Sequence, residues 1–188
     1  MRALIFLLAC CFSIPAWAQE MKPVKVVATF SILGDVVKNV GGNKIDLSVL
    51  VGPNGDAHTF EPTPQDNILL SSAAVIFENG LYYEQWLNDV YASSGSKARR
   101  VVVTEGVETL GKNDNRKDVD PHVWHDVANV MIMTEWVRDG LIAADEVNAP
   151  YYRENAEIYL TKLGELNHAI IDTLKDLSDT QRQLVTAH

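Results

Sequence analysis

The sequence predicts an α/β protein, in which a parallel sheet flanked by helices is followed by one long connecting helix. First, apolar, β-rich runs alternate with amphipathic segments from about residue 25 onward, which is typical of a parallel sheet covered on both faces. Second, Pro150 to Leu177 carries apolar residues at helical spacing. A helix of about 28 residues would be roughly 42 Å long. Such a helix exceeds one small domain, so we expect it to lead to a second one.

The amino-terminal residues predict an export signal. Met1-Arg2 gives a positively charged start, residues 3–14 are apolar, and Ala16-Trp17-Ala18 is a small-x-small cleavage site. We therefore expect a signal peptide over residues 1–18, a mature chain that begins at Gln19, and a periplasmic location. No later segment is long and apolar enough to be expected to span a membrane.

The cysteines offer one alternative to a soluble mature protein. Leu7-Leu8-Ala9-Cys10 resembles a lipobox, although lipid attachment at Cys10 would leave an apolar stretch of only about six residues. Cys10 and Cys11 both lie within the predicted signal, so the mature chain has no cysteine. A metal site in it would use His, Asp and Glu, and the Cys-rich zinc classes are excluded.

The charge balance limits the partners. The chain has 16 basic and 25 acidic residues, for a formal net charge of −9 at pH 7. An acidic surface argues against nucleic acid as a partner and is compatible with cationic ligands.

The elements follow from periodicity and from Gly, Pro and capping residues. Strands are predicted at Lys25–Thr29, Ile45–Val51, Ala74–Phe77 and Arg100–Val103. Helices are predicted at Ser31–Gly41, Pro64–Ser72, Tyr83–Tyr91, Asp126–Leu141 and Pro150–Leu177. Ser31 is expected to cap the first helix and Gly41-Gly42 to end it.

The order of these elements predicts the domain organisation. Residues 19–148 are expected to form an amino-terminal lobe, residues 149–178 the connecting helix, and residues 179–188 the start of a second lobe. The last of these includes a short predicted strand at residues 183–186. We therefore expect the chain to be an amino-terminal fragment of a longer protein.

Two loops predict a metal site. Residues 56–62 (Asp-Ala-His-Thr-Phe-Glu-Pro) and 120–124 (Asp-Pro-His-Val-Trp) each contain one histidine, a carboxylate and a proline, and cannot be helix interiors. A neighbouring carboxylate can hold the tautomer of a metal-binding imidazole. The loops follow the second and fourth predicted strands, and ligands of open parallel sheets bind beyond the carboxyl ends of the strands. His58 and His122 are therefore the candidate ligands.

Four motifs resemble one known family. They are His-x-Phe-Glu-Pro at His58–Pro62, Asn-Gly-x-x-x-Glu-x-Trp-Leu at Asn79–Leu87, Asp-Pro-His-x-Trp at Asp120–Trp124, and the terminal Val185–His188. Together they resemble the zinc- and manganese-binding periplasmic proteins of metal ABC transporters, the ZnuA/TroA-like family. The resemblance implies two lobes joined by a long helix, with the metal between them. It also implies a monomer that is not an enzyme and that delivers a divalent metal ion to a membrane permease for import.

The resemblance also implies the ligand set. His58 and His122 match the two ligands of the first lobe, His188 matches the first ligand of the second lobe, and the fourth ligand would lie downstream. Zinc members often have histidine at the third position and manganese members often have glutamate. Because imidazole suits zinc, zinc is the favoured ion. Manganese is the alternative, since residues 111–118 lack the histidine-rich loop of many zinc members.

Two other functions are considered. A secreted zinc hydrolase could use His58 and His122 with Glu61 as its base, but no His-Glu-x-x-His helix and no nucleophile constellation is recognisable. A surface adhesin, a role attributed to some family members, would need a lipid anchor. Asp120 and Glu61 are interpreted either as partners of the histidines or as loop caps.

The remaining histidines and the tryptophans are given structural roles. His125 is expected to begin the next helix and face solvent, and His168 to lie on the surface of the long helix. Core or lobe-interface positions are expected for Trp86, Trp124 and Trp136.

Overall fold

The computed structural model describes residues 22–109, 119–178 and 180–181. The predicted signal peptide, the predicted strand at residues 183–186 and the candidate ligand His188 lie outside these residues. The boundaries of the predicted lobes therefore stay predictions. Among the described residues, no helix has both the length and the apolar character needed to cross a membrane.

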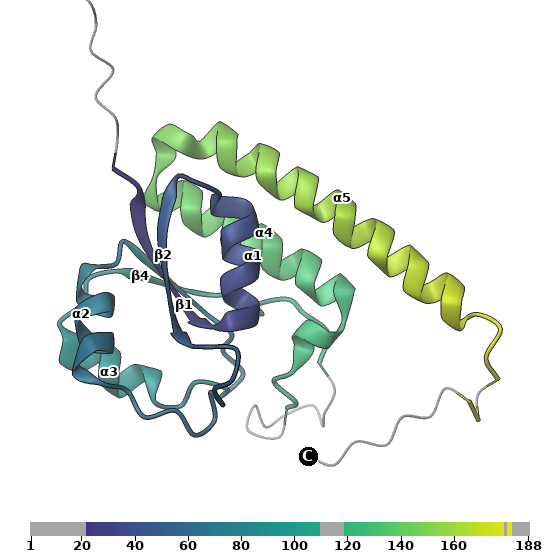
Figure 1. The fold of residues 1–188 in the computed structure, drawn as a ribbon, viewed down its shortest axis with the longest axis horizontal. Coiled ribbons are helices and arrows are strands. Elements are labelled where there is room, and N and C mark those ends of the chain that lie inside the picture. The colour runs from purple at the N-terminus through teal and green to yellow at the C-terminus, as the bar shows by residue number, and fades with distance from the viewer. Residues whose placement is uncertain (1–21, 110–118, 179, 182–188) are drawn as a thin grey trace, which may run out of the picture.

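A four-stranded sheet forms the centre of the fold (Figure 1). Its strands are β1 (Val24–Phe30), β2 (Ile45–Val51), β3 (Val75–Glu78) and β4 (Arg99–Val102). They run parallel in the order β2-β1-β3-β4. The predicted fold class is confirmed. The chain order reverses between β1 and β3, and ligands of such sheets bind beyond the carboxyl ends of the strands at this point.

Helices cover both faces of the sheet (Figure 1). The helices on one face are α1 (Ser31–Gly41), α4 (Val127–Ala144) and α5 (Ala149–Leu174), and those on the other are α2 (Pro64–Ser72) and α3 (Leu87–Ser94). Successive side chains of a strand point to opposite faces. Val26 and Ala28 accordingly join the larger core, under α1, α4 and α5, whereas Val27 joins the smaller core, under α2 and α3.

Most element bounds agree with the periodicity. The bounds of β2 and α2 are those predicted, and β3 and β4 are each displaced by one residue. Thr63 precedes α2, and the Asp66 carboxylate accepts hydrogen bonds from the Thr63 backbone N (2.7 Å) and Oγ1 (2.8 Å). Gly42 ends α1 with φ +56°. Ser31, however, is the first helical residue and not the cap, which is Phe30.

The predicted start of the third helix is wrong. The helix was expected from Tyr83 but begins at Leu87. Gly80, Leu81 and Tyr82 have φ values of +79°, +53° and +61°, which no α-helix contains. The next residues are used in tertiary contacts, since the Glu84 carboxylate accepts from Thr29 Oγ1 of β1 at 2.6 Å and Trp86 Nε1 donates to the Ala57 carbonyl oxygen at 2.9 Å. Tertiary hydrogen bonds therefore override the local helical pattern here.

The long helix α5 is present as predicted and ends at Leu174, three residues early. Its first half packs on the larger core through the buried side chains of Tyr152, Ala156 and Leu163. Beyond Leu163 its apolar side chains are exposed, among them Leu166, Ile170, Ile171 and Leu174. The second half of α5 extends away from the sheet (Figure 1).

Candidate metal centre

The two candidate histidines meet at the carboxyl edge of the sheet. His58 lies in the loop after β2, and His122 lies immediately before a 3₁₀ turn, η2 (Val123–His125), which leads to α4. Although they are 64 residues apart in sequence, their Nε2 atoms are 3.2 Å apart. A tetrahedral ion with metal–nitrogen bonds of about 2.0–2.1 Å places two ligand nitrogens about 3.3 Å apart. The observed separation is that of a hydrogen bond between the two rings, and it also matches two nitrogens that share one metal ion.

Two aspartates hold the histidines in place. Asp120 Oδ1 lies 2.6 Å from His122 Nδ1 and also accepts from the His122 backbone N at 3.0 Å. A carboxylate at Nδ1 keeps the proton on that nitrogen, so Nε2 presents its lone pair to a metal. Asp56 Oδ1 accepts from the His58 backbone N at 2.9 Å and acts as a loop cap. Asp120 thus both caps its loop and orients the imidazole, whereas Glu61 is exposed.

Aromatic rings pack against both imidazoles. The Tyr83 ring lies edge-on to His58 with centroids 4.8 Å apart and to His122 at 5.9 Å. Trp124 lies 5.2 Å from His122, and Phe30 packs on both Tyr83 and Trp124. Burial, with Glu84 and Asp56 nearby, raises the pKa of Tyr83 above its usual value. The Tyr83 hydroxyl therefore stays protonated at neutral pH and adds no charge to the site.

The residue after Tyr83, Glu84, carries a buried carboxylate. Glu84 is 6% exposed and accepts hydrogen bonds from Thr29 Oγ1 (2.6 Å), Asn79 N (2.7 Å) and Gly80 N (3.0 Å). Burial raises the pKa of Glu84 to about 7, against the lowering effect of these hydrogen bonds. Sequence reasoning gave Glu84 no role of its own. The only signal was its place in the Asn-Gly-x-x-x-Glu motif.

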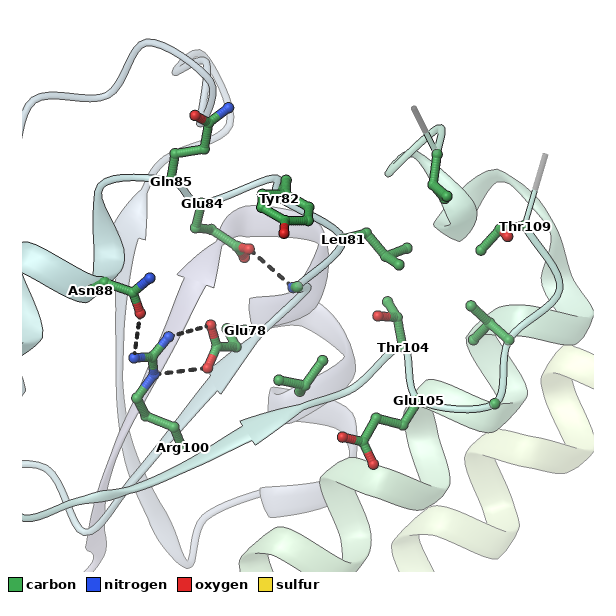
Figure 2. Close-up of a pocket in the computed structure, with 15 residues that line it drawn as sticks. Glu78, Leu81, Tyr82, Glu84, Gln85, Asn88, Arg100, Thr104, Glu105 and Thr109 are labelled. Atoms are coloured by element: carbon green, nitrogen blue, oxygen red, sulfur yellow. Dashed lines mark hydrogen bonds and ion pairs between the residues drawn. The ribbon is translucent and has the colours of Figure 1, made fainter. Parts of the chain in front are cut away.

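A candidate ligand lines one of two cavities in this part of the fold. One of about 730 Å³ lies beside the Gly80–Tyr82 turn and is lined by Arg100 (Figure 2). The Arg100 guanidinium is already paired with the Glu78 carboxylate at 2.8 and 2.7 Å. A second cavity of about 360 Å³ is lined by His122 and His125.

The other singled-out residues lie as follows. His125 is exposed in η2, 5.8 Å from the Trp124 ring, and His168 is exposed on α5. Trp86, Trp124 and Trp136 pack partly buried against the core. Within the described residues, no three His, Cys, Asp or Glu side chains converge on one metal position. The structure thus brings His58 and His122 together, and His188 lies beyond the residues that it describes.

The fold and the site define a class of protein. A parallel α/β lobe with two apposed histidines at its carboxyl edge, followed by a long helix, is the arrangement of a metal-binding α/β protein. Residues 26–188 match the family described as "ZnuA: Zinc-uptake complex component A periplasmic", and the chain belongs to this family. The resemblance seen in the motifs is therefore confirmed.

Individual relatives support this assignment. The chain is 35% identical to the manganese-binding lipoprotein MntA of Halalkalibacterium halodurans, over 89% of this chain and 55% of that protein. It is 30% identical to the iron ABC transporter substrate-binding lipoprotein MtsA of Streptococcus pyogenes serotype M1, over 97% of this chain and 62% of that protein. The chain thus spans little more than half the length of these relatives. Their names describe metal binding and substrate binding for an ABC transporter, in agreement with the prediction of a non-enzymatic protein.

A solved structure shares the fold. The Mn-bound periplasmic metal binding protein of Candidatus Liberibacter asiaticus superposes with a TM-score of 0.68 at 28% identity, over 82% of this chain and 55% of that one.

Proposed function

We propose that this protein captures a divalent metal ion outside the cytoplasm and delivers it to the membrane permease of an ABC transporter for import. The observation that carries the proposal is the 3.2 Å approach of the His58 and His122 Nε2 atoms, with Asp120 holding the His122 ring. Relatives with metal-transport names support the cargo and the permease. We also propose that the protein is a monomer. We propose no nucleic-acid partner, in keeping with the net charge of −9.

The choice of metal rests on two opposing considerations. A third imidazole, from His188, would make the site nitrogen-rich and favour zinc over manganese. The relatives, however, are named for manganese or iron. Since zinc exceeds manganese in intrinsic affinity at most N/O sites, tight zinc binding in solution does not identify the transported ion. We propose that zinc binds more tightly than manganese and that the physiological cargo is one of these two ions.

The first test is a metal titration of the protein expressed from its complete reading frame. Isothermal calorimetry is expected to give one ion per chain. His58→Ala and His122→Ala each remove a metal ligand. Each variant should therefore lose more metal affinity than the roughly ten- to hundredfold typical when a residue that hydrogen-bonds to a ligand is replaced. The matched control is His168→Ala, an exposed histidine on α5. Wild-type affinity in both site variants would refute the assignment.

The location is tested separately. We propose export through the signal at residues 1–18. The relatives are named as lipoproteins, so lipid attachment at Cys10 is the alternative. Mass spectrometry of the mature amino terminus distinguishes a free start at Gln19 from a lipidated Cys10. A lipidated terminus would replace the periplasmic location with a membrane-anchored one and revive the adhesin alternative.

A further inference from the structure

One segment contacts the loops of both candidate ligands. We call Asn79–Trp86 the bracket segment. At one end, Asn79 Nδ2 donates to the carbonyl oxygen of Pro121, the residue before His122, at 3.0 Å. At the other end, Trp86 Nε1 donates to the carbonyl oxygen of Ala57, the residue before His58, at 2.9 Å. The conformation of this segment therefore sets the position of both histidines.

The bracket segment is bent into an unfavourable backbone conformation. Leu81 and Tyr82 both have positive φ, which is strained for residues with a side chain. Such a conformation persists only when surrounding contacts impose it. The Glu84 carboxylate supplies these contacts, because it accepts from the backbone N–H groups of Asn79 and Gly80 at the start of the bend. Figure 2 shows the Glu84 carboxylate turned toward the backbone of this bend.

The holding power of Glu84 depends on its ionisation. An ionised carboxylate is acceptor-only and suits three donors, whereas the protonated acid is a weaker acceptor and carries an O–H that needs an acceptor of its own. Thr29 from β1, Asn79 and Gly80 are the donors.

The charged and titratable groups around Glu84 lie on three elements. The negative charge of Glu78 on β3 raises the pKa of Glu84. The Glu84 charge in turn raises the pKa of the neighbouring Tyr83 and of Arg100 on β4, which is paired with Glu78. Burial makes the largest contribution and moves the pKa of Glu84 to about 7. Both forms of Glu84 are therefore populated near neutral pH.

We propose that Glu84 is a positioning residue whose ionised carboxylate holds the bracket segment, and through it His58 and His122, in the metal-binding arrangement. This inference rests on the proposed metal-capture function. By thermodynamic reciprocity, if ionised Glu84 favours the metal, the metal favours ionised Glu84. Metal binding near neutral pH must then expel a proton from Glu84, in addition to any from the ligands.

The test is calorimetry of zinc binding by the complete protein, in two buffers of different ionisation enthalpy, between about pH 6 and pH 8. This range brackets the pKa of Glu84, about 7. Wild type should release more protons per zinc than Glu84→Gln near neutrality, where Glu84 is half ionised. Zinc affinity of Glu84→Gln should be about tenfold below wild type at the alkaline end. This gap should shrink at the acidic end, where wild-type Glu84 is itself protonated.

Two further variants make the result specific. Glu105→Gln removes one exposed carboxylate near the same edge and should match wild type in affinity and proton release. Thr29→Val keeps the Glu84 charge but removes one donor that lowers the pKa of Glu84. It should therefore move the extra proton release to higher pH. This shift tests the inference even if Glu84→Gln does not fold, which thermal unfolding would reveal.

The outcomes separate the two proposals. Wild-type protein that binds no metal overturns the metal-capture function itself. Wild-type protein that binds zinc, with equal proton release and a pH-independent affinity ratio in folded Glu84→Gln, overturns only the role of Glu84. If Glu84→Gln does not fold, a Thr29→Val release profile identical to wild type overturns it instead.

Discussion

Replacement of Asp120 tests how much the orientation of one imidazole contributes to metal affinity. Asp120 Oδ1 lies 2.6 Å from His122 Nδ1 and also accepts from the His122 backbone N. Asp120→Asn keeps an acceptor at this place but removes the charge. Asp120→Ala removes the acceptor altogether, so the His122 ring loses the partner that holds its tautomer and its loop loses a cap.

The expected loss of zinc affinity follows from the solvent exposure of the Asp120 side chain. Loss of a group that supports a metal-binding histidine typically costs ten- to hundredfold in affinity, or about 1.4–2.7 kcal/mol. The Asp120 side chain is 52% exposed, so solvent screens its charge and the charge contributes little. Most of the effect is therefore orientational. We expect at most about fivefold loss for Asp120→Asn and close to hundredfold for Asp120→Ala.

The assay is competition for zinc against a chelating dye of known affinity. Asp126→Ala is the matched control, because Asp126 caps α4 by accepting from the Ala128 backbone N at 2.8 Å. This variant should lose about 1 kcal/mol of stability and keep its zinc affinity. If Asp120→Ala bound zinc as wild type does, the argument from imidazole orientation would be refuted.

Three further predictions concern metal choice, pH and packing. His188→Glu in the complete protein should narrow the preference for zinc over manganese, because it replaces nitrogen by oxygen; an unchanged ratio in competition binding would remove His188 from the ligand set. The pKa of Glu84, about 7 when folded against 4.5 ordinarily, means that the folded state retains a proton that the unfolded state has lost. Between these values the free energy of unfolding should therefore fall as pH rises, by roughly 3 kcal/mol, and urea titrations should find this slope missing from Glu84→Gln. Gly140→Ala places a methyl group 2.5 Å from Phe77 Cε1, and should lower stability by about 1–3 kcal/mol; a thermal midpoint equal to wild type would contradict this.

The sequence by itself determined the features that depend on local patterns. The alternation of apolar runs and capped helices predicted the α/β class, and β2 and α2 were placed to the residue. Helical spacing after Pro150 predicted α5. The histidine loops were recognisable because proline and acidic residues mark them within a few positions of sequence. Local backbone preference and side-chain period suffice for such features.

Only the tertiary structure decided the features that join distant segments. It brought Nε2 of His58 and His122 to 3.2 Å, whereas the sequence could place them only at the same edge of the sheet. It also decided the late start of α3, because Glu84 and Trp86 are engaged with residues from other loops and strands. Burial likewise turned Glu84 from an ordinary acid into one with a pKa of about 7. Burial and long-range hydrogen bonds arise from packing, and no local window of sequence contains the partners that create them.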